Sequence, residues 1–479
     1  MDLKKKTNIN ETVDKAKKML EKEENISPAL RAIVEVLLMI VCIMAERLSL
    51  NSRNSSKPPS SDLNRKKKSK NKSDNKPGGQ KGRFGTTLKP VSSPDKTVTL
   101  ELDKSLLPSE GYKLTGYESR QVVDIEISRI VTEYKAEVWQ NTKGERIVAP
   151  FPARITHSIQ YGQSVKAHAV YLSQFQLMPY ERLKDYFACE VGIPVSVGSL
   201  FNFNNEAYVC LKEFDALAKE RLQNANLLHL DETGINVNGE RIWLHNASNN
   251  LWTYLSPHAK RGKEAMDDIG ILPNFSGVML HDHWKPYFTY DNQHALCNAH
   301  HLRELENLVE NYGCQWANDM QKLLLTINDA VKASAKNQLG EKLAEQYRKQ
   351  YDEILEKAEK ESTPPELEGD KKKRGGPKKS KARNLYERLR DRVDDVLRFM
   401  CVDYVPFTNN QGENDIRMTK VQQKISGCFK SMEGAKIFCR IRSYLITARK
   451  HGITPTDALK SILDGRIPDA LLSNSGAGE

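Results

Sequence analysis

A series of short hydrophobic runs separated by turn signals constrains the fold of this chain more than any other feature. Turns at residues 238–239 and 249–250 separate the first three runs, as in antiparallel hairpins, whereas a fourth run leads toward a helix. The predicted strands cover residues 227–230, 241–246, 251–255 and 277–280, and the helix covers residues 295–312. The first run ends at Asp231 and the fourth at Asp282, so an acid closes each strand that reads as buried.

An RNase H-like sheet has this order of elements. In that fold the first and fourth strands lie side by side, which would bring Asp231 and Asp282 together. A third acid, Glu413, stands in a polar, glycine-containing entry to a helix, and residues 417–450 then hold nine Lys and Arg against a single acid, Glu433. A carboxylate beside so much positive charge favours a site that holds cations and then a polyanion.

Three acids placed in this way can bind the metal ions of a phosphodiester-cleaving enzyme. Mg²⁺ prefers hard oxygen ligands and keeps several waters, so a few carboxylates hold it together with a substrate phosphate. Two ions about 3.5–4 Å apart can activate the attacking oxygen of a phosphodiester reaction and stabilise the leaving oxygen. Asp231, Asp282 and Glu413 are therefore the predicted catalytic residues and metal ligands, with two Mg²⁺ or Mn²⁺ ions as cofactor. Chance is the alternative, because the chain has 62 Asp and Glu.

The net charge predicts a polyanionic partner. The 479 residues carry 73 Lys and Arg against 62 Asp and Glu, a formal charge of +11, and the excess is concentrated in blocks. DNA is the first interpretation and an anionic membrane surface the second. The eight cysteines are scattered without a CxxC pair, which indicates reduced thiols in a cytosol. No secretory signal is visible, and the longest hydrophobic run, residues 33–44, is shorter than the ~20 residues of a membrane span.

The N-terminal segments differ sharply in composition. Hydrophobic residues from Leu30 to Leu48 recur in steps of four and three, which predicts a coiled-coil helix within residues 1–50; it would serve dimerisation or pack on its own domain. Residues 51–95 read as a basic linker, disordered when free. Nine Lys and Arg face one acid between residues 65 and 83, which favours phosphate contacts over a merely solvated run. The DNA-binding residues predicted there are Arg65, Lys66, Lys67, Lys68, Lys81 and Arg83.

Two further segments precede the predicted sheet. Residues 96–155 alternate in the strand manner between glycine-containing turns and predict a small β-rich module whose function is not legible. Residues 156–224 regain helical periodicity, and a Gly-Ile-Pro break at residues 192–194 before a serine-capped helix has the outline of a helix-turn-helix. DNA binding is one interpretation of that corner, and an ordinary turn in a helical domain is the other.

The predicted core is split by a long insertion. Residues 225–312 form its first part and residues 405–479 its last part with C-terminal helices, while residues 313–404 form a helical insertion with a basic loop at residues 368–382. That loop either clamps DNA or is only a soluble tip. The predicted fold is thus multidomain α+β, with an RNase H-like α/β catalytic core preceded by a coiled-coil helix, a small β module and a helical, helix-turn-helix-like domain.

Three segments of the chain are similar to the IS66 family of bacterial insertion-sequence transposases. They read LLHLDETGINVNGERIWLH, GVMLHDHWKPYFTY followed by CNAHHLREL, and TNNQGENDIRMTKVQQKISGCFKSMEGAKIFCRIRSYLITARKHG, and the stretches NSSKPPSSD and KPGGQKGR resemble the linker of that family. The resemblance implies a DDE transposase that cuts and joins DNA at element ends with divalent metal. Its two Asp and its Glu fall on Asp231, Asp282 and Glu413.

The resemblance also implies partners and a location. Insertion-sequence ends and target DNA are the expected partners. A homo-oligomer is also expected, since two ends must be joined. Accessory proteins of the same element are a further expected partner. The expected location is the bacterial cytoplasm, at the nucleoid. Two other functions fit the same residues: an RNase H-like nuclease that hydrolyses without joining, and a DNA-binding protein without catalysis. The presence of all three acids within the family motifs favours the transposase.

Neighbouring residues complete the predicted site. Arg417, Lys420 and Lys424 continue the helix face of Glu413 and are predicted to contact phosphates. Glu232 follows Asp231 directly, so on a strand it points to the other face and is left out. Cys297 and His300 have a spacing that metals use, but one packed helix face is the preferred interpretation. Members of the IS66 family commonly carry a cysteine-rich zinc module, whereas this chain has no cysteine between residues 42 and 189, so no structural zinc is expected.

Overall fold

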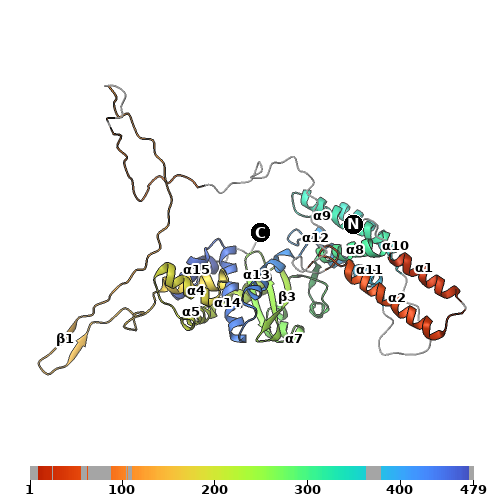
Figure 1. Cartoon of the computed structure of the whole chain (residues 1–479), viewed down its shortest axis with the longest axis horizontal. Coiled ribbons are helices and arrows are strands. Elements are labelled where there is room, and N and C mark those ends of the chain that lie inside the picture. The colour runs from red at the N-terminus through yellow and green to blue at the C-terminus, as the bar shows by residue number, and fades with distance from the viewer. Residues whose placement is uncertain are drawn as a thin grey trace.

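A five-stranded mixed sheet lies at the centre of the packed part of the chain (Figure 1). The computed structural model describes residues 9–23, 25–55, 62, 88–103, 105, 111–362 and 379–473. The sheet has the order β5-β4-β3-β6-β7, with β3 (Leu227–Val237), β4 (Glu240–Ser248), β5 (Thr253–His258), β6 (Val278–His281) and β7 (Gln293–Leu296). β3 to β5 are antiparallel, whereas β6 and β7 run parallel to β3. The chain is therefore a mixed α+β protein, as predicted.

The tight turn between β3 and β4 follows from its sequence. Asn238 and Gly239 both have positive φ, 49° and 90°, as the two central residues of a type I′ hairpin turn require. β3 then pairs with β6 on its other side, where Leu228 lies opposite Met279 and His229 opposite Leu280. The first and fourth strands of the sheet are thus hydrogen-bonded neighbours, as the order of hydrophobic runs predicts.

The two faces of the sheet are covered by different helices. Along β3, Leu228 and Leu230 lie on one face, whereas Ile235 and Val237 lie on the other, because side chains alternate along a strand. The first face shares one hydrophobic core with the helices that precede the sheet and with C-terminal helices. These elements are α3 (Gln163–Val170), η3 (Tyr171–Phe175), α4 (Tyr180–Tyr186), η4 (Phe187–Val191), α5 (Val197–Cys210), α6 (Lys212–Gln223), α15 (Pro455–Leu463) and α16 (Asp469–Leu472). Residues 163–223 therefore have no separate core of their own.

The predicted corner between two of these helices is present. The segment α4–η4 ends at Gly192, which is left-handed with φ of 67°, and Ser196 caps α5 by accepting a hydrogen bond of 3.0 Å from the backbone N–H of Ser199. The assignment of this corner as a helix-turn-helix and its contact with DNA both stay predictions.

Helix α14 (Met432–Lys450) protects an edge of the sheet. β5 is the outer strand, so its outward N–H groups lack a neighbouring strand. The N–H of Thr253 donates to Thr447 Oγ1 at 3.1 Å, and the N–H of Leu255 donates to Ser443 Oγ at 2.8 Å. Side chains of α14 therefore replace the missing strand. Helix α13 (Asn410–Ser426) lies on the second face, where Ile416 joins the residues of β3 and β4.

The predicted insertion packs at the opposite edge. Its helices are α9 (Gln315–Ala333), α10 (Glu341–Glu361), α11 (Lys381–Asp391) and α12 (Val393–Cys401), which follow α8 (Asn298–Tyr312). They share a second hydrophobic core with Val278 and Leu280 of β6 and Leu296 of β7. Most of the basic loop predicted at residues 368–382 lies outside the described residues. Short elements link β5 to β7: α7 (Lys263–Ile269), η5 (Leu272–Asn274) and η6 (Lys285–Thr289).

The N-terminal helices form an antiparallel pair, α1 (Ile9–Lys22) and α2 (Pro28–Ser49), which lie side by side (Figure 1). The heptad positions Leu37, Met44 and Leu48 are exposed, so a coiled coil with another chain stays a prediction. At 22 residues, α2 is longer than the hydrophobic run that the sequence marks, and by length and composition alone it could cross a membrane. The chain after α2 reaches α8, where Asn54 Nδ2 donates to Glu310 Oε2 at 2.8 Å.

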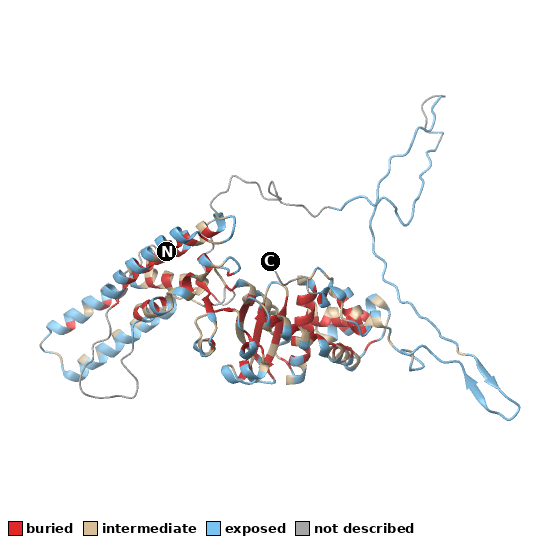
Figure 2. Cartoon of the chain, turned by 180° about the vertical axis from the view of Figure 1, so that it is seen from behind, coloured by how far each residue is buried: buried red, intermediate tan, exposed pale blue. Residues whose placement is uncertain are grey.

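Residues 96–155 contain little of the predicted β-rich module. Among the described residues of this segment, one antiparallel hairpin is present, β1 (Val138–Gln140) with β2 (Arg146–Val148). The hydrophobic side chains expected to form its interior are exposed, with Val122 and Ile130 each 90% accessible. Figure 2 shows the segment extended and coloured as exposed. Alternation marks residues able to form strands, but a strand also needs partners to pair with, and among the described residues of this segment only the hairpin provides them.

Candidate active site

Two adjacent strands bring the first two predicted acids together, but Asp231 lies within β3, which continues to Val237, and not at a strand end as predicted. His229 of β3 lies opposite Leu280 of β6 in the parallel register. Continued by two residues, this register sets Asp231 opposite Asp282, which directly follows β6. Both side chains then belong to the second face of the sheet, the face that α13 covers. The sheet topology therefore decides where these two carboxylates meet.

Asn409 fixes the third acid in place. Glu413 lies in the first turn of α13, and Asn409, 3% accessible, directly precedes that helix. The Asn409 amide donates to the Leu230 carbonyl at 2.7 Å, and its Oδ1 lies 2.8 Å from His229 Nδ1. Its backbone N–H donates to Cys297 Sγ at 3.2 Å. One residue thus ties the start of α13 to β3, beside Asp231, and to the end of β7.

Gly412 makes that attachment possible. A Cβ at this position would lie 3.0 Å from Asn409 Oδ1 and 3.1 Å from Asn409 Nδ2, closer than ordinary contacts. The Gly412 carbonyl also accepts a hydrogen bond of 3.3 Å from Asn246 Nδ2 of β4, the residue that pairs with Asp231. The glycine therefore lets the first turn of α13 sit directly over the strands that carry the acids.

Burial and the neighbouring acids both affect the ionisation of Asp231. Burial, and then the negative charges of Glu232, Asp282 and Glu413, raise the pKa of Asp231 to about 8. Within the described part of the chain, no Lys or Arg forms an ion pair with Asp231, Asp282 or Glu413. Glu413 Oε1 is buried and has no hydrogen-bond partner among those residues. Hard oxygen donors without a neutralising cation fit a divalent metal ion such as Mg²⁺.

Glu232, unlike these three acids, has a cationic partner. Its side chain, 2% accessible, accepts hydrogen bonds from Arg261 Nη2 and from the Tyr287 hydroxyl, each at 2.6 Å. The Arg261 guanidinium lies over two indole rings, 4.6 Å from the centroid of Trp243 and 4.1 Å from that of Trp284. Glu232 thus lies on the first face of the sheet with its own cation. It joins the segment after Asp282 to β3.

Burial keeps the histidines that flank Asp282 neutral. His281 is buried against the Tyr287 ring, and its Nε2 lies 3.0 Å from His294 Nδ1. Burial lowers the pKa of His281 to about 3. His283 lies beside Phe288, and burial lowers its pKa to about 4. Neither ring carries a positive charge that would compensate the acids at neutral pH.

Some of the Lys and Arg side chains that follow Glu413 form ion pairs or hydrogen bonds within the protein. Arg440 Nη2 lies 2.6 Å from Asp215 Oδ2, and Lys450 Nζ lies 3.0 Å from Asp415 Oδ2. Arg442 is buried and donates to the backbone carbonyls of Gln174 and Phe175 in η3. The predicted DNA-binding residues Arg417, Lys420 and Lys424 are exposed on α13, and Lys420 Nζ donates to the Gly234 carbonyl at 2.6 Å. The predicted residues Arg65, Lys66, Lys67, Lys68, Lys81 and Arg83 lie outside the described residues.

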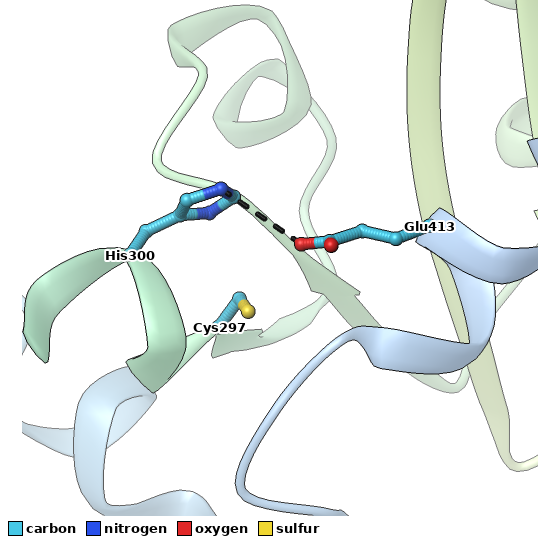
Figure 3. Close-up of side chains that lie close together, drawn as sticks. All are labelled: Cys297, His300 and Glu413. Carbon is cyan, nitrogen blue, oxygen red and sulfur yellow. Dashed lines mark ion pairs between the residues drawn. The ribbon is translucent and has the colours of Figure 1, made fainter. Parts of the chain in front are cut away.

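Sequence reasoning did not find every residue of this region. Asn409 and Gly412 belong to the motif NNQGEND, whose polar, glycine-containing character marks a helix entry but not the contacts of the asparagine. Arg261 follows β5 with no local signal, because its partners come from three separate elements. His300 of α8 lies with its Nε2 3.9 Å from Glu413 Oε1 (Figure 3), a contact that joins residues far apart in the sequence.

Comparison with known families identifies the chain. The family model described as Transposase IS66 family matches residues 158–437. The matched region contains the whole sheet, Asp231, Asp282 and Glu413, and the helical insertion. A family of unknown function (DUF6444) matches residues 5–89, and no curated protein matches the chain. Since the first match covers more than half of the sequence and coincides with the packed body, the chain belongs to the IS66 family of transposases.

Proposed function

We propose that this transposase cuts and joins DNA at insertion-sequence ends by a two-metal DDE mechanism. Asp231, Asp282 and Glu413 would hold the two divalent ions, Mg²⁺ or Mn²⁺. The observation that carries the proposal is the convergence of three carboxylates that form no ion pair with Lys or Arg within the described residues; burial, and then the neighbouring negative charges, raise the pKa of Asp231 to about 8. The order β5-β4-β3-β6-β7, with three antiparallel strands and two parallel ones, supports an RNase H-like catalytic core.

The residues of the chain have distinct tasks in this reaction. When bound, the metal ions supply Lewis-acid activation of the attacking oxygen and stabilisation of the leaving oxygen. Asp231 and Asp282 provide oxygen ligands from adjacent strands, and Asn409 holds the turn that carries Glu413 against β3. Glu232 already has Arg261 and Tyr287 as partners and stays outside the ligand set.

The proposed reaction has two steps, and in each step one P–O bond forms while another P–O bond breaks. Water first attacks a phosphodiester at the element end, which breaks one P–O bond and leaves a free 3′-hydroxyl. That hydroxyl then attacks a phosphodiester of the target, forming a new P–O bond as the old one breaks. Arg417, Lys420 and Lys424, exposed on the helix of Glu413, would hold the DNA backbone beside the carboxylates. Cytoplasmic location, oligomeric state and accessory proteins stay predictions.

Substitution of each acid tests the proposal. Full-length chain with DNA that carries the element ends should give Mg²⁺- or Mn²⁺-dependent cleavage and strand transfer. Asp231→Asn, Asp282→Asn and Glu413→Gln should each lower both products by more than about 10³-fold and leave DNA binding intact, as expected when a charge needed in the transition state is lost. Asp415→Asn is the matched control, because Asp415 lies on the same helix but pairs with Lys450.

Other outcomes would select a different function. Cleavage without any joined product would favour a nuclease of the same fold. DNA binding without cleavage, even with accessory proteins added, would favour a protein that only binds DNA. Equal loss in Asp415→Asn and Glu413→Gln would reject the assignment of the third ligand.

A further inference from the structure

A second group of potential metal ligands shares Glu413 with the proposed catalytic site. Cys297 directly precedes α8 and His300 lies in its first turn, while Glu413 comes from the first turn of α13 (Figure 3). One ligand atom of each, the thiol sulfur, a ring nitrogen and a carboxylate oxygen, lies within 4.8 Å of the other two. Helix starts from two parts of the chain thus bring three different donors to one point.

Two atoms of this group are buried without a partner. His300 Nδ1 and Glu413 Oε1 both lie out of solvent, and neither has a hydrogen-bond partner within the residues that the structure describes. Buried polar atoms are nearly always paired, so atoms left unpaired mark a place where a ligand can bind. The third donor, Cys297, is 1% accessible, and its sulfur accepts the backbone N–H of Asn409 at 3.2 Å. Burial raises the pKa of the Cys297 thiol although the N–H of Asn409 acts against this, so a metal ion that binds the sulfur must displace the thiol proton.

The chemistry of the donors selects the kind of metal. Mg²⁺ takes hard oxygen ligands and has little affinity for a thiolate. Thiolate, imidazole and carboxylate together suit Zn²⁺, which accepts all three and is held by three protein ligands where a fourth position stays open. The spacing of Cys297 and His300 alone did not distinguish a metal site from a packed helix face. Glu413 supplies the third donor that the sequence could not place beside them.

We propose that Cys297, His300 and Glu413 form a Zn²⁺ site that competes with the catalytic use of Glu413. This inference rests on the proposed function only in giving Glu413 a catalytic role. The carboxylate has two oxygens, and one of them lies 3.9 Å from His300 Nε2. Zn²⁺ bound by Cys297 and His300 draws the Glu413 carboxylate toward α8 and away from Asp231 and Asp282. Zn²⁺ is therefore an inhibitor of the Mg²⁺-dependent reaction.

Cobalt substitution tests the site without any reaction. Full-length chain, purified in reductant and free of metal, is titrated with Co²⁺, and the cobalt–thiolate charge-transfer absorption is recorded. One Co²⁺ per chain should give this absorption, and Zn²⁺ should remove it. Cys297→Ser should abolish the absorption and His300→Asn should weaken binding by more than about tenfold, since even residues outside the ligand shell contribute that much. Cys189→Ser and Cys401→Ser are matched controls, because both thiols are exposed and should leave the absorption unchanged.

Asp231→Asn separates this site from the catalytic one. It should abolish cleavage and keep the cobalt–thiolate absorption. Zn²⁺ should inhibit wild-type cleavage at concentrations at least about tenfold below those needed for Cys297→Ser, in line with the loss of a metal ligand. Should Cys297→Ser fail to fold, protection of Cys297 from alkylation by Zn²⁺ in the wild-type chain, read by mass spectrometry, provides the same answer.

Failure of the two proposals gives different results. An active enzyme whose wild-type chain shows no cobalt–thiolate absorption, or whose absorption persists in Cys297→Ser, rejects the Zn²⁺ site and leaves the transposase proposal standing. An inactive enzyme with the absorption present supports the Zn²⁺ site and rejects the catalytic proposal.

Discussion

The packed body and the segment that precedes it use the same sequence pattern with opposite outcomes. On β3 the alternating residues Leu228 and Leu230 are 0% and 2% accessible, whereas Val122 and Ile130 in residues 96–155 are 90% accessible (Figure 2). β3 has strands on both sides and helices over both faces, while the described part of the earlier segment has one hairpin. Alternation therefore indicates which side chains of a strand lie on the same face. It does not predict which other elements of the protein cover that face.

The largest difference between the packed body and residues 96–155 is expected when an Asp replaces a hydrophobic residue in each, because only the body should be destabilised. Leu228→Asp puts a carboxylate into the core shared by the sheet and α3–α6, and it should cost more than about 4 kcal/mol, enough to prevent folding of the body. Val122→Asp, at an exposed position, should change the free energy of unfolding by less than about 0.5 kcal/mol. Melting followed by circular dichroism measures both. If Val122→Asp lowered stability like Leu228→Asp, residues 96–155 would belong to a core after all.

Asp231 should make the stability of the body depend on pH. Its folded-state pKa of about 8 lies above the ordinary value near 4, so between these values the folded chain holds a proton that the unfolded chain has lost. Stability without metal should thus fall by a few kcal/mol as pH rises from about 4 to about 8, and stay level above that. Melting temperatures in EDTA measure this, and Asp231→Asn should remove most of the fall. Mg²⁺ should restore stability at pH 8 in the wild type alone.

Asp124→Asn is the control from the exposed segment. Asp124 has its own backbone neighbour as its hydrogen-bond partner and lies at an exposed position. Its substitution should leave the pH profile of melting unchanged. An equal flattening of the profile in both variants would mean that Asp231 is not the group responsible.

The sequence predicts local features of the body better than its long-range contacts. Hydrophobic runs and turns are local, so they predict the strands near Asp231 and Asp282, whereas the neighbour relation of β3 and β6 follows only from the strand order of an RNase H-like sheet. The role of Asn409 depends on Leu230, His229 and Cys297, which no local pattern brings together. The boundary predicted at residue 224 separates helices that in fact share one core with the sheet, because a hydrophobic helix face does not identify what covers it.

Loss of a cation inside the body should lower its stability more than loss of a cation at its surface. Arg440 on α14 pairs with Asp215 of α6 at 2.6 Å and lies 3.9 Å from the Tyr208 ring centroid. Arg440→Ala leaves Asp215 without its cation in a mostly buried position, and it should lower the free energy of unfolding by about 2–4 kcal/mol. Lys436→Ala, at an exposed position of the same helix, should cost less than about 0.5 kcal/mol. Urea denaturation of the two variants compares them, and equal effects would mean that the Arg440 ion pair adds nothing to the body.

Removal of residues 1–155 should have only a small effect on the stability of the body and a clear effect on DNA binding. Described contacts of this part with the body include two ion pairs near the surface, Arg53 with Glu306 at 3.3 Å and Arg154 with Asp464, and a hydrogen bond to Glu310 from Asn54, which is 2% accessible. Exposed pairs contribute about 0–1 kcal/mol each, so the melting temperature of the remaining body should change by only a few degrees. The deletion also removes the nine Lys and Arg between residues 65 and 83.

Each phosphate contact that is lost lowers the slope of log affinity against log salt by about 0.9. DNA affinity of the shortened chain should therefore fall at low salt, and its salt dependence should become flatter, as fluorescence anisotropy at several salt concentrations would show. An unchanged slope would mean that the basic linker does not touch DNA and that the exposed cations of α13 account for binding. A body that no longer folds would mean instead that residues 1–155 cover part of its core, and the contrast between the two regions would disappear.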